Sequence, residues 1–175
     1  MRQKISKIKM ILMDVDGVLT NGEIIYTSSG DELKIFNVQD GMGITLAHLA
    51  GLKTGIITGR MSALVERRAH ELKMDIVSQG NFNKLPEYER VIRDFELKDE
   101  EVCYIGDDVL DLPILKRVGF SVAVANARDE VKAVCDYVTS AQGGKGAVRE
   151  VIDRILKWQN KLHEVIDRLS EQPFD

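Results

Sequence analysis

Short apolar runs alternate with longer amphipathic stretches along most of the chain. Runs rich in β-branched and aliphatic residues predict buried strands at 10–15, 54–58, 76–78, 102–106 and 121–124, with a short edge strand at 137–138. Helices are expected between them, at about 43–50, 62–72, 85–95, 112–118 and 129–134. Strands that are apolar throughout and alternate with helices indicate right-handed crossovers and a parallel sheet covered on both faces. We therefore expect an α/β fold, a doubly wound parallel sheet in three layers.

Two short β-prone runs interrupt this alternation directly after the first strand. The runs at 24–26 and 33–36 flank a turn-forming cluster at 27–31. This pattern predicts a β-hairpin, spanning about 22–37, inserted behind the first strand. Because an isolated hairpin is only marginally stable in water, we expect it to pack on another part of the protein or on another subunit.

The C-terminal stretch, from about 146 to 175, carries a heptad pattern. Apolar residues recur every seven positions and again three positions later: Val148, Val151, Ile155, Trp158, Leu162, Val165 and Leu169. The pattern predicts one helix with a single apolar seam over 147–169. Its first half is expected to dock on its own domain, and its second half meets either that domain or a partner chain. The pattern leaves the order of the tail beyond Leu169 open.

Composition and charge narrow the class of protein. The chain has 175 residues, 44% of them apolar, and 24 basic against 28 acidic residues give a net charge of −4. This length suits a single domain, 1–175, with its own core, and the mild acidity disfavours a nucleic-acid binder. No apolar run approaches the roughly 18 residues of a membrane span, and Asp14 ends the first apolar stretch too early for a secretory signal. Because Cys103 and Cys135 also lack metal-ligand spacing, we expect a soluble cytoplasmic protein.

Two aspartates follow the first predicted strand, in the segment Asp14-Val15-Asp16-Gly17. In extended chain Asp14 and Asp16 point to the same side, and two such close charges need a cation or a shared proton. The carboxyl ends of parallel strands are also where α/β sheets bind ligands. The alternative is a turn that merely ends the strand. A calcium loop of the EF-hand type is excluded, because its twelfth position, which should be Glu, is Ile25.

A second acidic cluster, Asp107, Asp108 and Asp111, follows the strand at 102–106. If this strand neighbours the first, the carboxylates of both clusters converge on one cleft. Oxygen ligands of this kind suit a hard divalent cation, most simply Mg²⁺. For Asp111 the alternative is a solvated acidic loop, an interpretation that fits Asp107 at the strand tip poorly.

Two further strand ends carry groups suited to a phosphate. Thr58-Gly59-Arg60 follows the second strand, where a hydroxyl and backbone N–H groups can hold a phosphate oxygen. Thr58 can also serve as a helix N-cap. Lys84 follows the third strand and can neutralise phosphate charge, although a lysine there is more often solvated. The segment at 143–146 does not match the phosphate-binding loop of NTPases.

The order of these motifs resembles that of the haloacid dehalogenase superfamily of phosphotransferases. The resemblance implies that Asp14 attacks phosphorus to form an aspartyl-phosphate and that Asp16 is the general acid and base. It implies that Mg²⁺ is held by the Asp14 carboxylate, the Asp16 backbone carbonyl and Asp107, with Asp108 in support. Thr58 and Lys84 would stabilise the charge on the transferred phosphoryl group.

Most members of that superfamily cover the site with a cap domain, for which this chain has no space. The amino-acid sequence of its segments 36–44, 79–84 and 143–150 resembles that of the capless subfamily of 3-deoxy-D-manno-octulosonate 8-phosphate (KDO 8-P) phosphatases. The resemblance implies a homotetramer, in which hairpins and a neighbour's C-terminal tail close each site, and an acidic sugar phosphate that is a lipopolysaccharide precursor. It also implies substrate contacts from Asn37, Val38, Gln39, Asp40, Gly41, Thr45, Gly59, Arg60 and Arg68.

The chain departs from the subfamily at two places, which affects the identity of the substrate more than the chemistry. The subfamily commonly has Arg at the position of Gln39, and Gln-Ser at the positions of Asn81 and Phe82. Arg68 can equally be a solvated helix charge. The enzymatic alternative is a phosphatase for another sugar acid, such as the nine-carbon KDN 9-phosphate. A non-catalytic regulatory module on the same fold is disfavoured, because every catalytic motif residue is present.

Overall fold

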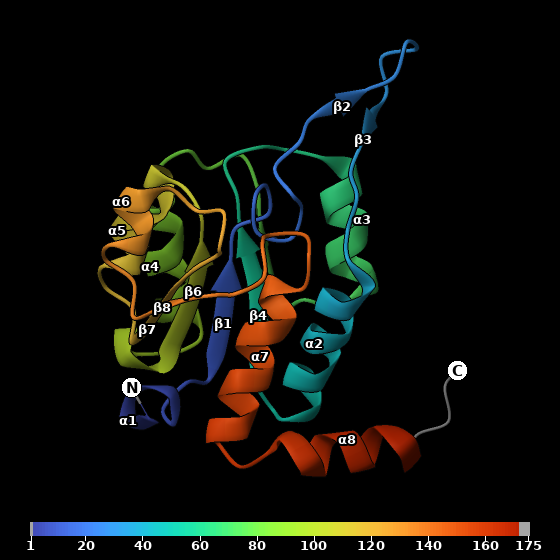
Figure 1. Ribbon diagram of the computed structural model, residues 1–175. Helices are drawn as coiled ribbons and strands as arrows, with labels where there is room; N and C mark the ends of the chain where they lie inside the picture. The colour runs from blue at the N-terminus through green and yellow to red at the C-terminus, as the bar shows by residue number, and fades with distance from the viewer. Residues whose placement is uncertain (1, 172–175) are drawn as a thin grey trace.

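The computed structural model describes residues 2–171 and places a six-stranded parallel sheet at the centre of the molecule (Figure 1). The strands lie in the order β5-β4-β1-β6-β7-β8. Their bounds are β1 Met10–Met13, β4 Lys53–Ile57, β5 Ile76–Ser78, β6 Val102–Gly106, β7 Phe120–Ala123 and β8 Tyr137–Val138. β1 lies between β4 and β6, with Met13 paired with Ile56 on one side and Ile105 on the other. The central strand therefore ends beside two others.

Helices cover both faces of this sheet, which confirms the predicted three-layer α/β fold. α2 (Val38–Leu49), α3 (Ala63–Glu71) and α7 (Ala147–Trp158) lie on one face (Figure 1). α4 (Leu85–Asp94), α5 (Leu112–Leu115) and α6 (Asp129–Lys132) lie on the other. Two 3₁₀ turns, η1 (Asp99–Glu101) and η2 (Val109–Asp111), flank β6, and α1 (Arg2–Ile5) precedes β1. The side chains of β1, β6 and β7 are buried throughout, as expected of strands covered on both faces.

The first helix that packs on the sheet after β1, α2, begins earlier than the apolar pattern predicts. α2 begins at Val38 rather than near 43, because the Asn37 side chain caps it by accepting a hydrogen bond from the Gln39 N–H at 2.8 Å. Gly41 and Gly43 lie inside this helix, and the low helix propensity of glycine is what hid its first turns. Gly43 packs directly against α7, where an added Cβ would lie 3.1 Å from the Arg149 backbone.

The C-terminal seam belongs to two helices, so the prediction of one helix over 147–169 is wrong. α7 ends at Trp158 and α8 spans Leu162–Glu171. Between them Asn160 adopts a left-handed conformation with φ of 56°, and the Lys161 N–H donates to the Leu156 carbonyl at 2.8 Å. Both halves still bury apolar side chains in their own chain, since Val165 of α8 is 1% exposed. The predicted tail beyond 171 lies outside the described residues.

A two-stranded antiparallel ribbon stands off the layers near the carboxyl end of β1 (Figure 1). It comprises β2 (Ile25–Tyr26) and β3 (Glu32–Leu33), and Ile25 pairs with Leu33. Among residues 2–171, no helix is long and apolar enough to cross a membrane.

Candidate active site

Asp14 lies at the tip of the central strand, where the β1 ladder continues for one more residue. Its N–H donates to the Ile105 carbonyl of β6 at 3.0 Å. Asp14 as a whole residue is 8% exposed. Its carboxylate accepts a hydrogen bond from the Val15 N–H at 2.7 Å and lies 2.9 Å from the Lys84 Nζ. The backbone of two strands therefore holds this carboxylate at the carboxyl edge of the sheet.

Three carboxylates from two neighbouring strand ends meet there. Asp14, Asp107 and Asp111 each present an oxygen within 4.8 Å of the others. Asp107 follows β6 directly, and its Oδ1 is buried with no hydrogen-bond partner among the described residues. An unpaired buried carboxylate oxygen is costly unless a ligand satisfies it. The free oxygen of Asp107, opposite Asp14, therefore fits a hard divalent cation such as Mg²⁺.

Asp111 has a different part in the cluster, because its own oxygens already have donors. It is fully buried and accepts hydrogen bonds from the Lys84 Nζ at 2.7 Å, the Tyr104 hydroxyl at 2.8 Å and the Asp107 N–H at 3.0 Å. It therefore orients the lysine and the turn that carries Asp107. The interpretation of Asp111 as part of a solvated loop is wrong.

Asp108 lies at the edge of this cluster. It is exposed, and its carboxylate accepts the Val109 N–H at 2.7 Å as the cap of η2. Its N–H donates to Asp111 at 3.3 Å. The residue is thus tied through its backbone to the turn that carries Asp107, and its side chain is not among the three that converge.

Burial shifts the pKa values of the two carboxyls that face each other. Burial, with a further contribution from Asp111, raises the pKa of Asp14 to about 6, although the neighbouring Lys84 opposes the rise. Burial and the charges of Asp14 and Asp111 raise the pKa of Asp107 to about 8. Both shifts arise from concentrating negative charge out of water, a state that a bound dication relieves.

Lys84 connects the two acidic strand ends. It is 2% exposed and immediately precedes α4, and five residues (79–83) separate it from the end of β5. Burial alone would lower the pKa of Lys84, but the charges of Asp14 and Asp111 outweigh it and raise the pKa above its usual value. The lysine is therefore a fixed positive charge beside Asp14, and the alternative of a solvated surface lysine is wrong.

Thr58, Gly59 and Arg60 follow β4 on the other side of Asp14. Thr58 is 2% exposed, its N–H donates to the Ser78 carbonyl at 2.9 Å, and its carbonyl accepts the Asn81 N–H at 3.1 Å. Thr58 is not a helix cap, because Ser62 precedes α3. Gly59 lies beside the exposed ring of Phe82. The two loops behind β4 and β5 are thus joined through Thr58.

The predicted sugar-facing residues divide between the surface and the interior. Val38 is 81% exposed and Gln39 is also exposed, whereas Asp40 is 1% exposed. The Asp40 carboxylate accepts the N–H groups of Gly146 at 3.3 Å and Arg149 at 2.9 Å. The Asp40 carboxylate therefore caps α7: it pairs with N–H groups at the N-terminus of the helix, where a negative charge is favourable.

Three other residues of the predicted sugar-facing set also contact their own chain. The Asn37 Nδ2 donates to the Gly144 carbonyl at 3.3 Å, and the Thr45 hydroxyl donates to the Gly41 carbonyl at 3.3 Å. Arg68 lies against Gly41, where an added Cβ would be 2.5 Å from its Nη2, and pairs with Glu71 at 3.3 Å. The part of this segment left for a ligand is its exposed start, at Val38 and Gln39.

Two hairpin residues that sequence reasoning missed reach the site. Lys34 forms an ion pair with Asp16, and Glu32 accepts a hydrogen bond from the Arg60 Nη2 at 2.8 Å. The signal was available in the alternation of charged Glu32 and Lys34 with apolar Leu33 and Ile35.

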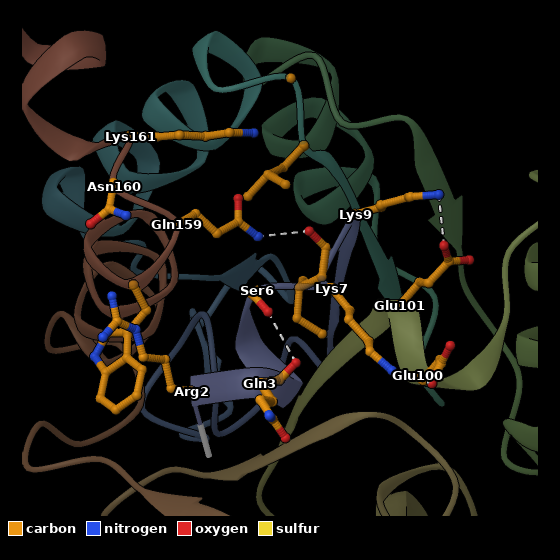
Figure 2. A pocket seen from close by; sticks show the side chains of 14 residues that line it. Arg2, Gln3, Ser6, Lys7, Lys9, Glu100, Glu101, Gln159, Asn160 and Lys161 are labelled. Carbon is orange, nitrogen blue, oxygen red and sulfur yellow. Dashed lines mark hydrogen bonds and ion pairs between the residues drawn. The ribbon is translucent and has the colours of Figure 1, made fainter.

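A cavity of about 870 Å³ lies at the other end of the sheet and has a different character (Figure 2). Four of its charged residues form two ion pairs, Lys7 with Glu100 and Lys9 with Glu101. Gln159 donates to the Ile8 carbonyl at 2.8 Å across it. None of the described residues that line it is a predicted site residue.

Comparisons with known proteins agree with this geometry. The haloacid dehalogenase-like hydrolase family matches residues 69–152. The 3-deoxy-D-manno-octulosonate 8-phosphate phosphatase KdsC of Escherichia coli K12 is 44% identical over 161 residues, covering 92% of this chain and 86% of the relative. The enzyme of that name from Yersinia pestis is 43% identical over 160 residues, covering 91% of this chain and 86% of the relative.

Solved structures show the same similarity in three dimensions. The crystal structure of this phosphatase from Moraxella catarrhalis, in complex with magnesium ion, phosphate ion and KDO, has a TM-score of 0.93 and 43% identity, covering 96% of this chain and 97% of that chain. The cobalt-bound phosphatase of Haemophilus influenzae has a TM-score of 0.88 and 39% identity, covering 91% of this chain and 94% of the other.

A Gly17→Ala substitution should weaken divalent-cation binding by about 5- to 150-fold, because the added methyl group would displace the Asp107 carboxylate at a cost of about 1–3 kcal/mol. Gly17 has a φ of 94°, and an added Cβ would lie 2.1 Å from the Asp107 Oδ2. The matched control is Gly30→Ala, where φ is 91° but nothing lies within 4 Å. Calorimetric titration with Mg²⁺ measures both variants. Equal affinities in the two would contradict the role given to the Gly17–Asp107 contact.

Mg²⁺ affinity should increase as pH rises from about 6 to about 8, because the cation displaces protons held by Asp14 and Asp107. Both pKa values are raised above those of the unfolded chain. The folded metal-free protein therefore binds more protons, and its free energy of unfolding falls as pH rises through this window. Calorimetry in two buffers of different ionisation enthalpy measures the proton release. A pH-independent affinity without proton release would refute this account.

Proposed function

This chain belongs to the 3-deoxy-D-manno-octulosonate 8-phosphate phosphatase family of haloacid dehalogenase-like hydrolases, and we propose that it hydrolyses KDO 8-P to KDO and phosphate. The observation that carries the proposal is the 44% identity to the E. coli phosphatase over 92% of this chain. The similar structure from M. catarrhalis, described with magnesium, phosphate and KDO, supports both the substrate and the metal.

Asp14 is proposed as the nucleophile. One of its oxygens forms a bond to phosphorus while the bond from phosphorus to the sugar oxygen breaks, which leaves an aspartyl-phosphate. The residue suits this task because two strands fix it and Lys84 lies 2.9 Å from its Oδ2. Water then attacks the phosphorus, which releases phosphate and restores the carboxylate.

The other residues of the site manage charge and protons. Bound Mg²⁺ would be held by Asp14, the Asp16 backbone carbonyl and Asp107, with Asp108 in support, and it would offset the repulsion between a carboxylate and a phosphoryl group. Asp16 gives a proton to the leaving sugar oxygen and later takes one from the attacking water. Lys84 and Thr58, with the adjacent Gly59 N–H, stabilise the transferred phosphoryl group.

Phosphate release from KDO 8-P, KDN 9-phosphate and glucose 6-phosphate, each with Mg²⁺ or with a chelator, tests this function. We expect Mg²⁺-dependent turnover with kcat/KM for KDO 8-P at least about tenfold above the others, a difference of about 1.4 kcal/mol. Asp14→Asn should lower turnover at least about a thousandfold and remain folded. Asp129→Asn is the matched control, since that side chain is fully exposed.

Other results would redirect the assignment. Preference for the nine-carbon ester would favour the alternative sugar-acid phosphatase. If wild-type protein releases no phosphate from any of these esters with Mg²⁺, the chain is a binding module on this fold.

We further propose that the chain, one domain over 1–175, acts as a cytoplasmic homotetramer in lipopolysaccharide biosynthesis. The apolar outward side of the hairpin supports self-association. Ile24 and Leu33 are each 49% exposed, Tyr26 is 64% exposed and Ile35 is 65% exposed. Monomeric proteins rarely expose so many large apolar side chains on one small element. The name of the relatives, a phosphatase of KDO 8-P and therefore a source of free KDO, supports the pathway.

Sedimentation velocity measures this association directly. Wild-type protein should sediment as a tetramer. The double variant Tyr26→Ser, Ile35→Ser should sediment as smaller species, because the subunit contact loses the stabilisation of about 25 cal/mol for each Å² of apolar surface that it buries. Val134→Ser is the control, a similar change just beyond the end of α6 at a residue that is 38% exposed. A wild-type monomer at micromolar concentration would refute the tetramer.

A further inference from the structure

The strand that descends from the hairpin tip turns its charged side toward the body of the protein. Glu32, Lys34 and Phe36 are partly buried, whereas Leu33 and Ile35 between them are exposed. The Lys34 side chain itself is only 2% exposed. Lysines are almost never buried to this extent without a charged partner, so the partner of Lys34 identifies what the hairpin is built to contact.

That partner is Asp16, two residues beyond the nucleophile. The Lys34 Nζ forms an ion pair with the Asp16 Oδ1 and lies 3.8 Å from the Glu32 Oε1. On the other side, the Arg60 Nε lies 3.8 Å from the Asp16 Oδ2. Each oxygen of the Asp16 carboxylate thus faces one cation, and one of these cations belongs to the hairpin.

Glu32 completes the connection between the hairpin and the loop behind β4. It accepts hydrogen bonds from the Arg60 Nη2 at 2.8 Å and the Ser62 hydroxyl at 3.1 Å. Two carboxylates and two cations therefore alternate around a closed ring formed by Asp16, Lys34, Glu32 and Arg60. Alternating charges stabilise one another and restrict each side chain to one orientation.

The orientation of the Asp16 carboxylate is fixed by fewer contacts than that of Asp14. Its side chain is 21% exposed, and the Lys34 ammonium is the only hydrogen-bond donor to its carboxylate within residues 2–171. Asp14, in contrast, also accepts a backbone N–H. Without Lys34, the Asp16 carboxylate would keep only the longer contact of its Oδ2 with the Arg60 Nε at 3.8 Å and no hydrogen-bond donor from residues 2–171.

We infer that Lys34 is a positioning residue, which holds the Asp16 carboxylate where it meets the leaving oxygen of the substrate. The inference rests on the proposed phosphatase function and extends it to a residue of the hairpin. Proton transfer requires the acid within hydrogen-bond reach of the leaving oxygen. A displacement of about 1 Å at such a group can cost about a hundredfold in rate.

Two other roles for Lys34 lead to different kinetics. A lysine that binds an anionic group of the substrate contributes to ground-state binding, and its loss raises KM. A lysine that only anchors the hairpin contributes to stability, and its loss lowers the melting temperature with kcat unchanged. A positioning residue for Asp16 affects kcat at nearly constant KM.

The test is Lys34→Met, which keeps the apolar stem and removes the charge, assayed on KDO 8-P at saturating Mg²⁺. We expect kcat to fall by about 10- to 100-fold, with KM within about threefold of wild type and with the melting curve still cooperative. Lys34→Arg, which restores the charge, should recover most of the lost kcat. If the Met variant does not fold, Lys34→Gln is assayed by the same criteria.

Two control variants separate this role from a general effect of charge or of hairpin anchoring. Lys7→Met removes a lysine that pairs with Glu100 at the far end of the sheet and should leave kcat unchanged. Glu32→Gln weakens the anchor to Arg60 but keeps the contact between Lys34 and Asp16, so its kcat should stay above that of Lys34→Met.

Specific results would overturn the inference. A kcat of the neutral Lys34 variant within about threefold of wild type, or a loss of kcat/KM that arises from KM alone, would exclude positioning of Asp16. Equal losses in Glu32→Gln and Lys34→Met would reduce Lys34 to an anchor. These outcomes are distinct from failure of the proposed function, in which wild-type protein itself releases no phosphate.

Discussion

A buried lysine held between two buried carboxylates is the interaction on which the site depends. Lys84 lies 2.9 Å from Asp14 and 2.7 Å from Asp111, and the three side chains follow different strands. Removing one partner of such a buried set typically costs 3–5 kcal/mol, because the others keep uncompensated charge. The triad therefore requires β1, β5 and β6 to end at the same edge of the sheet. It also leaves one excess negative charge there, which Asp107 increases and a dication offsets.

Glycines let the loops around this triad approach one another. An added Cβ on Gly17 would lie 2.1 Å from the Asp107 carboxylate, and one on Gly143 would lie 1.7 Å from the Gly17 carbonyl. The segment at 143–146, which is not a phosphate-binding loop, thus supports the loop that carries Asp14 and Asp16. Asp40 holds the end of that segment by capping α7. Backbone packing, rather than side-chain bulk, keeps the catalytic loop in place.

The hairpin shows how one small element can serve two surfaces. Period-two alternation sends Glu32 and Lys34 toward Asp16 and Arg60, and it sends Leu33 and Ile35 outward. A two-stranded ribbon has no core of its own, so ion pairs on its inner side provide its attachment to the body. Its apolar outer side is then available for another copy of the chain. A short insertion can therefore contact the carboxyl edge of the sheet with its charged side and present an apolar surface with its other side.

The sequence by itself determined the alternation of strands and helices and the residues that end each strand. If the strands at 10–15 and 102–106 are neighbours, the carboxylates of both clusters, Asp14 and Asp107 among them, were predicted to converge, and the family resemblance added Thr58 and Lys84 to the same site. Only the tertiary structure decided the burial of Asp111, the turn of Asp40 toward α7, the break of the C-terminal seam at Asn160 and the pairing of Lys34 with Asp16. These features depend on contacts between residues distant in the chain, 18 positions apart for Lys34 and Asp16 and 106 for Asp40 and Gly146. Local propensity and apolar periodicity carry no information about which distant donor a buried carboxylate meets.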